Sequence, residues 1–206
     1  MARKPDTASR ALDAALELAA TTGWQAMSLA DVARAAGITL GQLHEAYGSK
    51  NALLDGLSAR IDAVVLADSA GETGDEAPRD RLFDVLMRRL EAEAPHRDAL
   101  RSIARAAGSD PLAAVAGLCR LQRSMRWMLE AAGIDSSGPA GRMRSRALAL
   151  IYLDVMRVWF ADDSADLGRT MVALDRRLAQ ADRAVTRLAG LGRPGRRGDA
   201  AEQAAA

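Results

Sequence analysis

The sequence contains few residues that could perform catalysis or hold a metal ion. Its two histidines, His44 and His96, lie far apart, and neither has a ligand partner at a metal-binding spacing. Cys119 is the single cysteine, so no intrachain disulfide can form, and a reducing cytoplasm fits. No glycine-rich loop indicates phosphate binding. We therefore expect no catalytic residue, no metal and no cofactor, and a function that depends on binding.

The side chains best suited to recognition are arginines. Lys4 and Lys50 are the only lysines, so nearly all positive charge is carried by guanidinium groups. Guanidinium groups bind phosphate and carboxylate groups well. A GC-rich coding bias would also replace lysine by arginine and enrich alanine. The arginine excess and the net charge of +1 therefore do not identify a partner by themselves.

Composition and periodicity predict an all-α protein. Apolar residues make up 49% and charged residues 27% of the chain, which is ordinary for a globular protein. Alanine, leucine and arginine favour helices, and no segment alternates as a half-buried strand does. We expect helices over residues 6–22, 28–36, 39–47, from 49 onward, and then over 79–93, 96–107, 111–132, 141–160 and 164–190.

The polar segment at residues 68–78 divides the chain into two predicted domains. Its sequence, DSAGETGDEAP, is typical of a linker. We predict a helix-turn-helix module over residues 1–67, a helical ligand-binding domain over 79–191 and a disordered tail over 192–206. The N-terminus has no apolar signal core, and no run of about 18 apolar residues occurs. We therefore expect a cytoplasmic protein whose membrane contact is peripheral.

Residues 28–47 have the pattern of a helix-turn-helix. Ser28 can cap a first helix, Gly37 suits its left-handed end, and Thr39 can cap a short second helix. The order of residues from Ser28 to Leu54 resembles the N-terminal domain of the TetR regulator family, and the match covers about residues 8–66. The resemblance implies a DNA-binding repressor. The candidate DNA contacts are Ser28, Thr39, Gln42, His44, Tyr47 and Lys50.

Three departures weaken the expectation of DNA binding. The family usually has a tyrosine and a histidine, one residue apart, late in the recognition helix, and here these positions are His44 and Ala46. Glu45 adds a negative charge where phosphates would pass. Over residues 1–60, six basic residues are balanced by six acidic residues. A DNA-binding face usually carries a basic excess, so we expect DNA binding that is weak or lost, with the helices kept as a packing unit.

The segment after Phe160 combines an acidic start with an amphipathic pattern. Asp162, Asp163 and Ser164 suit a helix N-terminus. Apolar residues then recur every three or four positions, with arginines on the opposite face. Such a helix can lie on an anionic membrane surface, or it can pack on the core or on a dimer partner. The candidate membrane contacts are Leu174, Arg176, Leu178, Arg183, Val185 and Arg187.

The same segment resembles a second family. The runs at residues 81–90, 94–97, 146–152 and 162–178 are similar to the ubiquinone-biosynthesis lipid-binding family (Coq-nine-like), over roughly residues 79–182. That family is itself built on a TetR-like fold. The resemblance implies binding of an isoprenoid quinone lipid at a peripheral membrane surface, through a C-terminal amphipathic helix. It also implies a quinone hydroxylase as the protein partner.

Methionine and leucine side chains of the second domain are the candidate pocket. Methionine adapts to varied apolar ligands, although each of these residues could equally belong to an ordinary core. Aromatic side chains at the pocket mouth could contact a ring-shaped headgroup. The candidate lipid contacts are Leu86, Met87, Leu90, Met125, Trp127, Met128, Leu150, Ile151, Tyr152 and Trp159.

The sequence therefore predicts a TetR-like, all-α homodimer with an N-terminal three-helix module and a larger ligand-binding region. The preferred function is a lipid-binding accessory protein of ubiquinone biosynthesis, which presents its lipid to a hydroxylase. The alternative is a ligand-responsive repressor of the TetR family. A third interpretation is a protein–protein adaptor with a solid core.

Overall fold

A computed structural model describes residues 6–68 and 76–191 of the chain. Within these residues the secondary structure is helical throughout, which confirms the expected all-α class. The predicted tail at 192–206 and most of the predicted linker at 68–78 lie outside the described residues. The elements are α1 (Thr7–Leu18), the π-helical turn η1 (Ala19–Gly23), α2 (Leu29–Ala36), α3 (Leu40–Ala46), α4 (Lys50–Asp68), α5 (Pro78–Glu93), the 3-10 turn η2 (Ala94–His96), α6 (Arg97–Gly108), α7 (Pro111–Ala131), α8 (Gly138–Phe160) and α9 (Gly168–Leu191).

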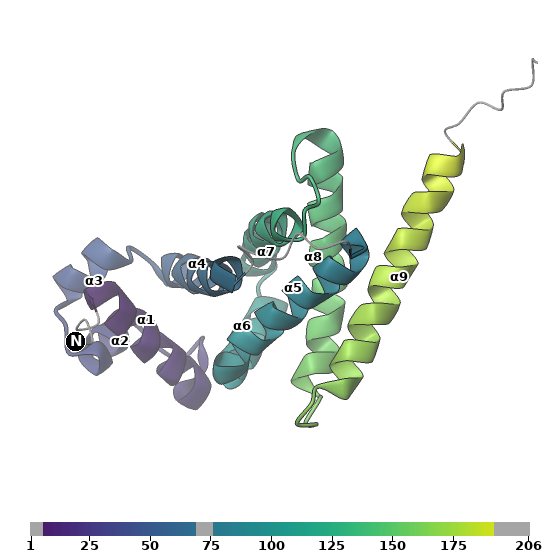
Figure 1. Cartoon of the computed structure of the whole chain (residues 1–206). Helices are drawn as coiled ribbons and strands as arrows, with labels where there is room; N and C mark the ends of the chain where they lie inside the picture. Colours follow the sequence, from purple (N-terminus) through teal and green to yellow (C-terminus); the bar gives the residue numbers. More distant parts are fainter. Residues whose placement is uncertain (1–5, 69–75, 192–206) are drawn as a thin grey trace, which may run out of the picture.

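The helices are arranged as a small module at one end and a larger bundle at the other (Figure 1). Helices α1, α2 and α3 form the module, and α4 runs from it into the bundle. In the bundle, α7 packs on α4, α5 and α8, while α9 lies on the outer side against α5 and α8. The predicted domain bounds, 1–67 and 79–191, stay a prediction.

Local capping explains how the short helices of the module begin and end. Ser28 and Asp31 form a reciprocal capping box at the start of α2, and Thr39 and Gln42 form another at the start of α3. Each box satisfies backbone N–H groups that have no partner inside the helix. Gly37 ends α2 at a φ of +62°, a left-handed conformation that glycine adopts without strain.

Two clusters of buried side chains form the cores of the two regions. The module's cluster includes Leu12, Val32, Leu43 and Leu57, so it joins α1, α2, α3 and α4. The bundle's cluster includes residues of α4, α5, α7, α8 and α9. Burying each large apolar side chain contributes roughly 1.5–3 kcal/mol. Since α4 supplies residues to both cores, it holds the module against the bundle.

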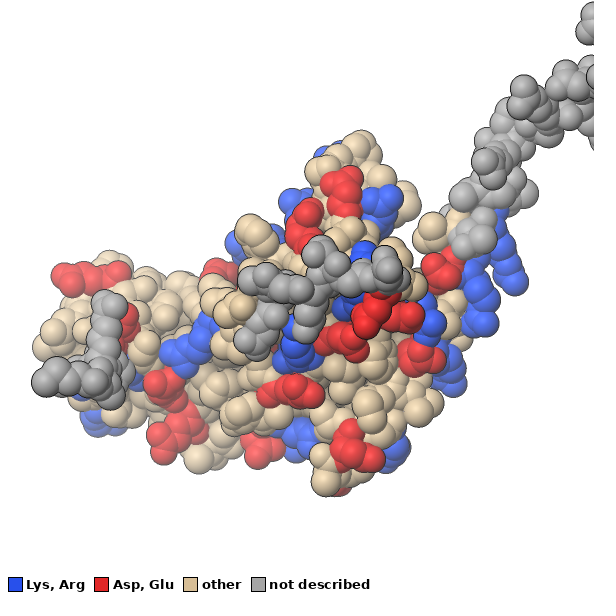
Figure 2. All heavy atoms as spheres, viewed as in Figure 1, with Lys and Arg blue, Asp and Glu red and all other residues tan. Residues whose placement is uncertain are grey.

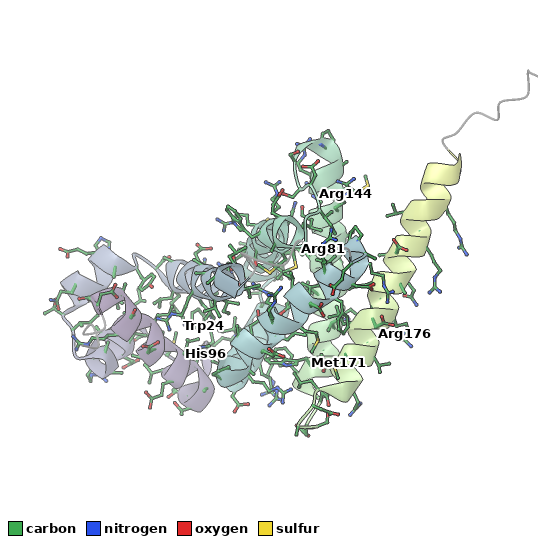
Figure 3. The ribbon with its side chains drawn as sticks, viewed as in Figure 1. Trp24, Arg81, His96, Arg144, Met171 and Arg176 are labelled. Carbon is green, nitrogen blue, oxygen red and sulfur yellow. The ribbon has the colours of Figure 1, made fainter. Side chains whose placement is uncertain are left out.

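Helix α6 is the second connection between the two regions. Ala99 belongs to the module's core, and Leu100 packs against both cores. The Ser102 hydroxyl accepts a hydrogen bond of 2.9 Å from the backbone N–H of Trp24, which follows η1 and lies at this boundary (Figure 3). On its other side, the Arg97 guanidinium donates to the carbonyl oxygens of Trp159 and Asp162, at 2.6 and 2.8 Å. Helix α6 is thus fixed both to η1 and to the end of α8.

Helix α9 begins at Gly168, four residues later than the sequence indicated. The predicted cap, Asp162, remains before the helix and reaches it through tertiary hydrogen bonds. Its carboxylate accepts from the N–H and hydroxyl of Thr170, at 2.8 and 2.7 Å, and from the Ser164 hydroxyl at 2.5 Å. Leu167 adopts a φ of +52° to turn the chain into α9. These hydrogen bonds hold the pKa of Asp162 well below its ordinary value.

We predict that Asp162→Asn lowers the midpoint of urea unfolding at pH 7. An amide cannot accept the same set of hydrogen bonds with both its terminal atoms. Because the folded state lowers the pKa of Asp162, its contribution is present above pH 4 and is lost as the pH falls below the unfolded value of about 3.9. The difference between wild type and variant should therefore shrink in the same titration below pH 4. A constant difference from pH 7 to pH 3 would contradict this role.

Candidate functional site

The exposed face of α3 is the candidate nucleic-acid interface. Thr39, Gln42 and His44 are exposed on it, and Leu40 adds an apolar side chain that is 57% exposed. Ser28 is exposed at the start of α2. The structure therefore places four of the six predicted DNA contacts on the surface. The other two, Tyr47 and Lys50, are half-buried.

Tyr47 packs on α4. A Cβ atom added at Gly56 would lie 2.6 Å from Cε1 of Tyr47, so the ring occupies the space that a side chain at this position would need. The absence of a side chain at Gly56 lets the end of α3 approach α4 closely. Burial raises the pKa of the Tyr47 hydroxyl. The packing of Tyr47 thus fixes the angle between α3 and α4.

Lys50 is held inside the module. Its ammonium group donates to the carbonyl oxygens of Trp24 and Met27, at 2.5 and 2.9 Å, and lies 5.0 Å from the centre of the Trp24 ring. Burial lowers the pKa of this amine. The ammonium therefore satisfies backbone carbonyls in the loop before α2, and this bonding competes with any contact to phosphate.

Other cationic side chains of the module also stabilise the module itself. Arg10 donates to the carbonyl oxygens of Ala36 and Gly37 at the end of α2, at 2.5 and 2.9 Å. Arg60 pairs with Asp13. Among the described residues of the module, Arg34 is the cation that remains well exposed, with 77% of its side chain accessible beside Asp31. On the face in Figure 2 the module accordingly shows few basic side chains.

The candidate ligand site is a pocket of about 460 Å³ between α4, α6, α7 and α8. Most of its wall is apolar. Helix α6 contributes four residues that lie along one of its faces: Leu100, Ile103, Ala104 and Ala107. The other helices contribute Leu57, Ile61, Leu118, Leu121, Met156 and Phe160. A concave site with apolar walls and a few converging polar groups is the usual form of a small-molecule pocket.

The polar end of the pocket is formed by Arg89, Glu93 and Tyr152. The Tyr152 hydroxyl donates to Oε2 of Glu93 at 2.9 Å, and Nη2 of Arg89 lies 3.2 Å from Oε1 of the same carboxylate. Behind the pocket wall, Nη1 of Arg89 donates to Asp62 Oδ1 at 2.5 Å, and the Ser124 hydroxyl donates to the same oxygen. Burial raises the pKa of the Glu93 carboxyl and of the Tyr152 hydroxyl. We call these five residues the buried polar cluster.

The predicted lipid contacts are spread over three environments. Tyr152 lines the pocket. Most of the others lie in the bundle's core or pack on it, and two lie on the surface. The core residues are Leu86, Leu90, Met125, Met128 and Trp159, the half-buried residues are Met87 and Ile151, and the exposed residues are Trp127 and Leu150. Of the ten predicted contacts, Tyr152 lines this pocket, and the core residues pack closely against one another instead.

Sequence reasoning missed the α6 wall and the two charged residues at the polar end of the pocket, Arg89 and Glu93. The α6 stripe follows the spacing i, i+3, i+4, i+7 from Leu100 to Ala107, so its apolar face was visible in the sequence. Arg89 and Glu93 are four residues apart on α5, which places them on one face. Nothing in the sequence indicated that this face is buried, because most such pairs are solvent-exposed.

The apolar stripe of α9 serves the core as far as Leu178. Leu174 and Leu178 are buried against the bundle, so they are not available to enter a membrane, while Val185 is exposed. Arg176 lies on the outer side of α9 (Figure 3), and basic side chains are visible along this helix in Figure 2. Arg183 and Arg187 are exposed further along the same helix. Among the described residues, no helix is both long enough and apolar enough to span a bilayer.

Comparisons with known proteins agree with this geometry. The family profile described as bacterial regulatory proteins, tetR family, matches residues 11–57. A TetR transcriptional regulator from Nitrosomonas europaea ATCC 19718 aligns over 86% of this chain and 99% of its own, at 26% identity and a TM-score of 0.69. A TetR transcriptional regulator from Rhodococcus sp. RHA1 aligns over 84% and 94%, at 22% identity and a TM-score of 0.59. A search of curated proteins finds no match. The chain has the TetR-like fold.

The resemblance of residues 79–182 to the ubiquinone-biosynthesis family receives no support. The family profile that matches lies in the N-terminal module, and the solved structures that align with most of the chain are described as transcriptional regulators. A quinone lipid, a hydroxylase partner and peripheral membrane association rested on that resemblance. They are not supported either. The misleading signal was the amphipathic pattern of α9, whose apolar side packs on α5 and α8.

We predict that Lys50→Met lowers the free energy of unfolding by about 1–3 kcal/mol, because two half-buried carbonyl groups lose a charged donor. Methionine keeps the length of the side chain. Arg34→Met is the matched control, because it removes an exposed cation and should change stability by less than about 0.5 kcal/mol. Urea unfolding measures both values. Unchanged stability in Lys50→Met, together with weaker DNA binding, would instead make Lys50 a phosphate contact.

Proposed function

We propose that this protein is a ligand-responsive, DNA-binding transcriptional regulator. The observation that carries the proposal is the position of α6, which lines an apolar pocket with one face and contacts η1 of the helix-turn-helix module with the other. A ligand in the pocket can change the position of α6 and, through it, the orientation of the module. The descriptions of the aligned structures as transcriptional regulators support the same function.

The structure favours DNA contacts that depend little on cationic side chains. The exposed surface of α3 carries Gln42 and His44, which can hydrogen-bond to base edges. Phosphates would be bound largely by backbone N–H groups at helix N-termini, because Arg10, Lys50 and Arg60 are occupied within the module. We therefore infer a specific site with modest affinity and a shallow dependence on salt.

Selection of genomic DNA fragments by the purified protein, followed by a salt titration of the enriched site, tests this function. We expect one enriched, two-fold symmetric sequence. Besides the cations that are bonded within the module, each module's sequence contains Arg3, Lys4 and Arg34. Two modules should therefore give a slope of log affinity against log salt no steeper than about −5. The absence of any enriched sequence would contradict the proposal. A steeper slope would contradict the inferred mode of binding.

Glu45→Gln should tighten binding to the selected site by roughly two- to fivefold, because it removes a negative charge from α3 where phosphates pass. Because Glu45 is exposed, the substitution should change the free energy of unfolding by less than about 0.5 kcal/mol. Glu17→Gln, with the same charge change on α1, is the matched control and should leave affinity unchanged. Fluorescence anisotropy measures both. Equal effects of the two substitutions would show that only net charge matters.

We also propose that the protein is a homodimer that packs through the outer face of α8 and α9. Met143 and Leu150 of α8 and Val172 of α9 are large apolar side chains left exposed there. A two-fold arrangement would present two modules to a symmetric DNA site. The exposed apolar side chains and the regulator-like fold support the proposal.

Leu150→Glu should convert the dimer into a monomer at micromolar concentration, because a buried, unpaired carboxylate is unfavourable in an interface. Leu112→Glu is the matched control: Leu112 is 82% exposed on α7, against 59% for Leu150. Analytical ultracentrifugation gives the mass of each variant. A Leu150→Glu dimer, or a Leu112→Glu monomer, would place the interface elsewhere.

A further inference from the structure

The charges of the buried polar cluster do not balance. Arg89 carries one positive charge, while Asp62 and Glu93 carry two negative charges when both are ionised. Arg89 and Glu93 are each only 3% exposed, so water compensates little of the difference. A buried carboxylate without full compensation is unfavourable, which is why burial raises the pKa of Glu93. The cluster can therefore gain stability from one more proton or from one more cation.

The unused hydrogen-bonding positions at this end of the pocket are one donor and several acceptors. The donor is Nε of Arg89, which is buried without a hydrogen-bond partner among the described residues. Both Nη atoms of Arg89 already face carboxylates, Asp62 on one side and Glu93 on the other. A carboxylate has about four lone-pair positions, and Glu93 uses one for Tyr152 and one for Arg89. The Tyr152 oxygen, which donates its hydrogen to Glu93, can itself accept. An incoming N–H group would thus find acceptors on Glu93 and Tyr152.

The rest of the pocket suits a ligand whose remaining part is apolar. The α6 stripe from Leu100 to Ala107 lies along one side, and Phe160 and Met156 line α8. At Gly117 on α7, an added Cβ would meet nothing within 4 Å, so open space adjoins this position. Burying an apolar group along these walls contributes about 25 cal/mol per Å² removed from water.

We propose that the pocket takes an apolar amine in its protonated form, with the ammonium group at Glu93 and Tyr152 and the apolar body along α6. The proposal rests on the regulator function proposed above and names the chemical class of its ligand. The ammonium supplies the missing positive charge and donates to the free acceptors. The same cation would meet little competition from water, because the polar end is enclosed.

The main competing class is an apolar anion. Arg157 is exposed at the pocket wall, and Arg120, which pairs with Asp55 at 2.9 Å, lines it as well. A carboxylate could pair with Arg157 while its chain enters the pocket. Arg157 faces solvent, where screening weakens such a pair, whereas Glu93 lies in a medium of low dielectric constant. This contrast favours an amine over an anion as the ligand. Binding of an anion is one of the outcomes that the experiment below can detect.

The test uses decylamine, decanol and decanoate, which share one chain and differ in the charge of the head. Isothermal titration calorimetry at pH 7 measures their binding to wild type, Glu93→Gln, Tyr152→Phe, Arg157→Gln and Gly117→Leu. We expect decylamine to bind wild type at least tenfold more tightly than decanol, as a charged hydrogen bond allows. Glu93→Gln should remove this preference for decylamine, while its affinity for decanol should stay within threefold of the wild-type value. Tyr152→Phe, which keeps the carboxylate, should weaken decylamine by a smaller factor.

Gly117→Leu fills the pocket without touching the buried polar cluster, so it should weaken all three compounds. Circular dichroism melting of each variant confirms that it is folded. Decanol or decanoate binding as tightly as decylamine would overturn the proposal, and loss of decanoate in Arg157→Gln would assign the site to an anion. Binding of none of the three would overturn it too. DNA selection on the same wild-type sample tests the regulator function separately. If the protein bound decylamine but selected no DNA sequence, the proposed ligand class would stand and the proposed regulator function would fail.

Discussion

The arrangement of the bundle depends on the buried ion pairs that the guanidinium of Arg89 forms with Asp62 and Glu93. The guanidinium is buried among α4, α5, α7 and α8, and it pairs with Asp62 of α4 and Glu93 of α5, while Tyr152 of α8 closes the cluster. Removing one partner of a buried ion pair commonly costs about 3–5 kcal/mol, because the other charge is left without compensation. The same cluster links α4 to the bundle and forms the polar end of the pocket. A ligand that reaches it therefore contacts the residues that hold the helices together.

Two helices carry any change from the pocket to the DNA module. Helix α4 enters the module's core through Leu53 and Leu57, and Leu57 also lines the pocket. Helix α6 is clamped to α8 by Arg97 and to the loop after η1 by Ser102. A ligand shifts DNA affinity only by the difference between its own affinities for the two arrangements, which in allosteric proteins is typically 1–3 kcal/mol. Helix α6 packs on η1 as closely as α7 packs on α8, so a displacement of α6 acts directly on the module.

Features set by neighbouring residues were predictable from the sequence, and features set by distant residues were not. The capping boxes at Ser28 and Thr39 and the turn at Gly37 require only local geometry, and the structure confirms them. The start of α9 depends on Asp162 reaching Thr170, a contact that no local pattern specifies. Likewise, the roles of Lys50 and Arg10 follow from carbonyl groups that lie more than twenty residues away. The apolar pattern of α9 was correctly identified, but an amphipathic pattern does not tell a membrane from a protein core.

The coupling of the pocket to the DNA module is tested most directly by the affinity of the selected DNA site with the pocket empty and with it full. Fluorescence anisotropy with a saturating amount of whichever decyl compound binds gives both values, for wild type and for Ser102→Ala. We expect filling the pocket to change the DNA affinity of wild type at least fivefold, and that of Ser102→Ala less, because the hydrogen bond from Trp24 to α6 is lost. Equal DNA affinities of wild type with an empty and a demonstrably full pocket would contradict the coupling through α6.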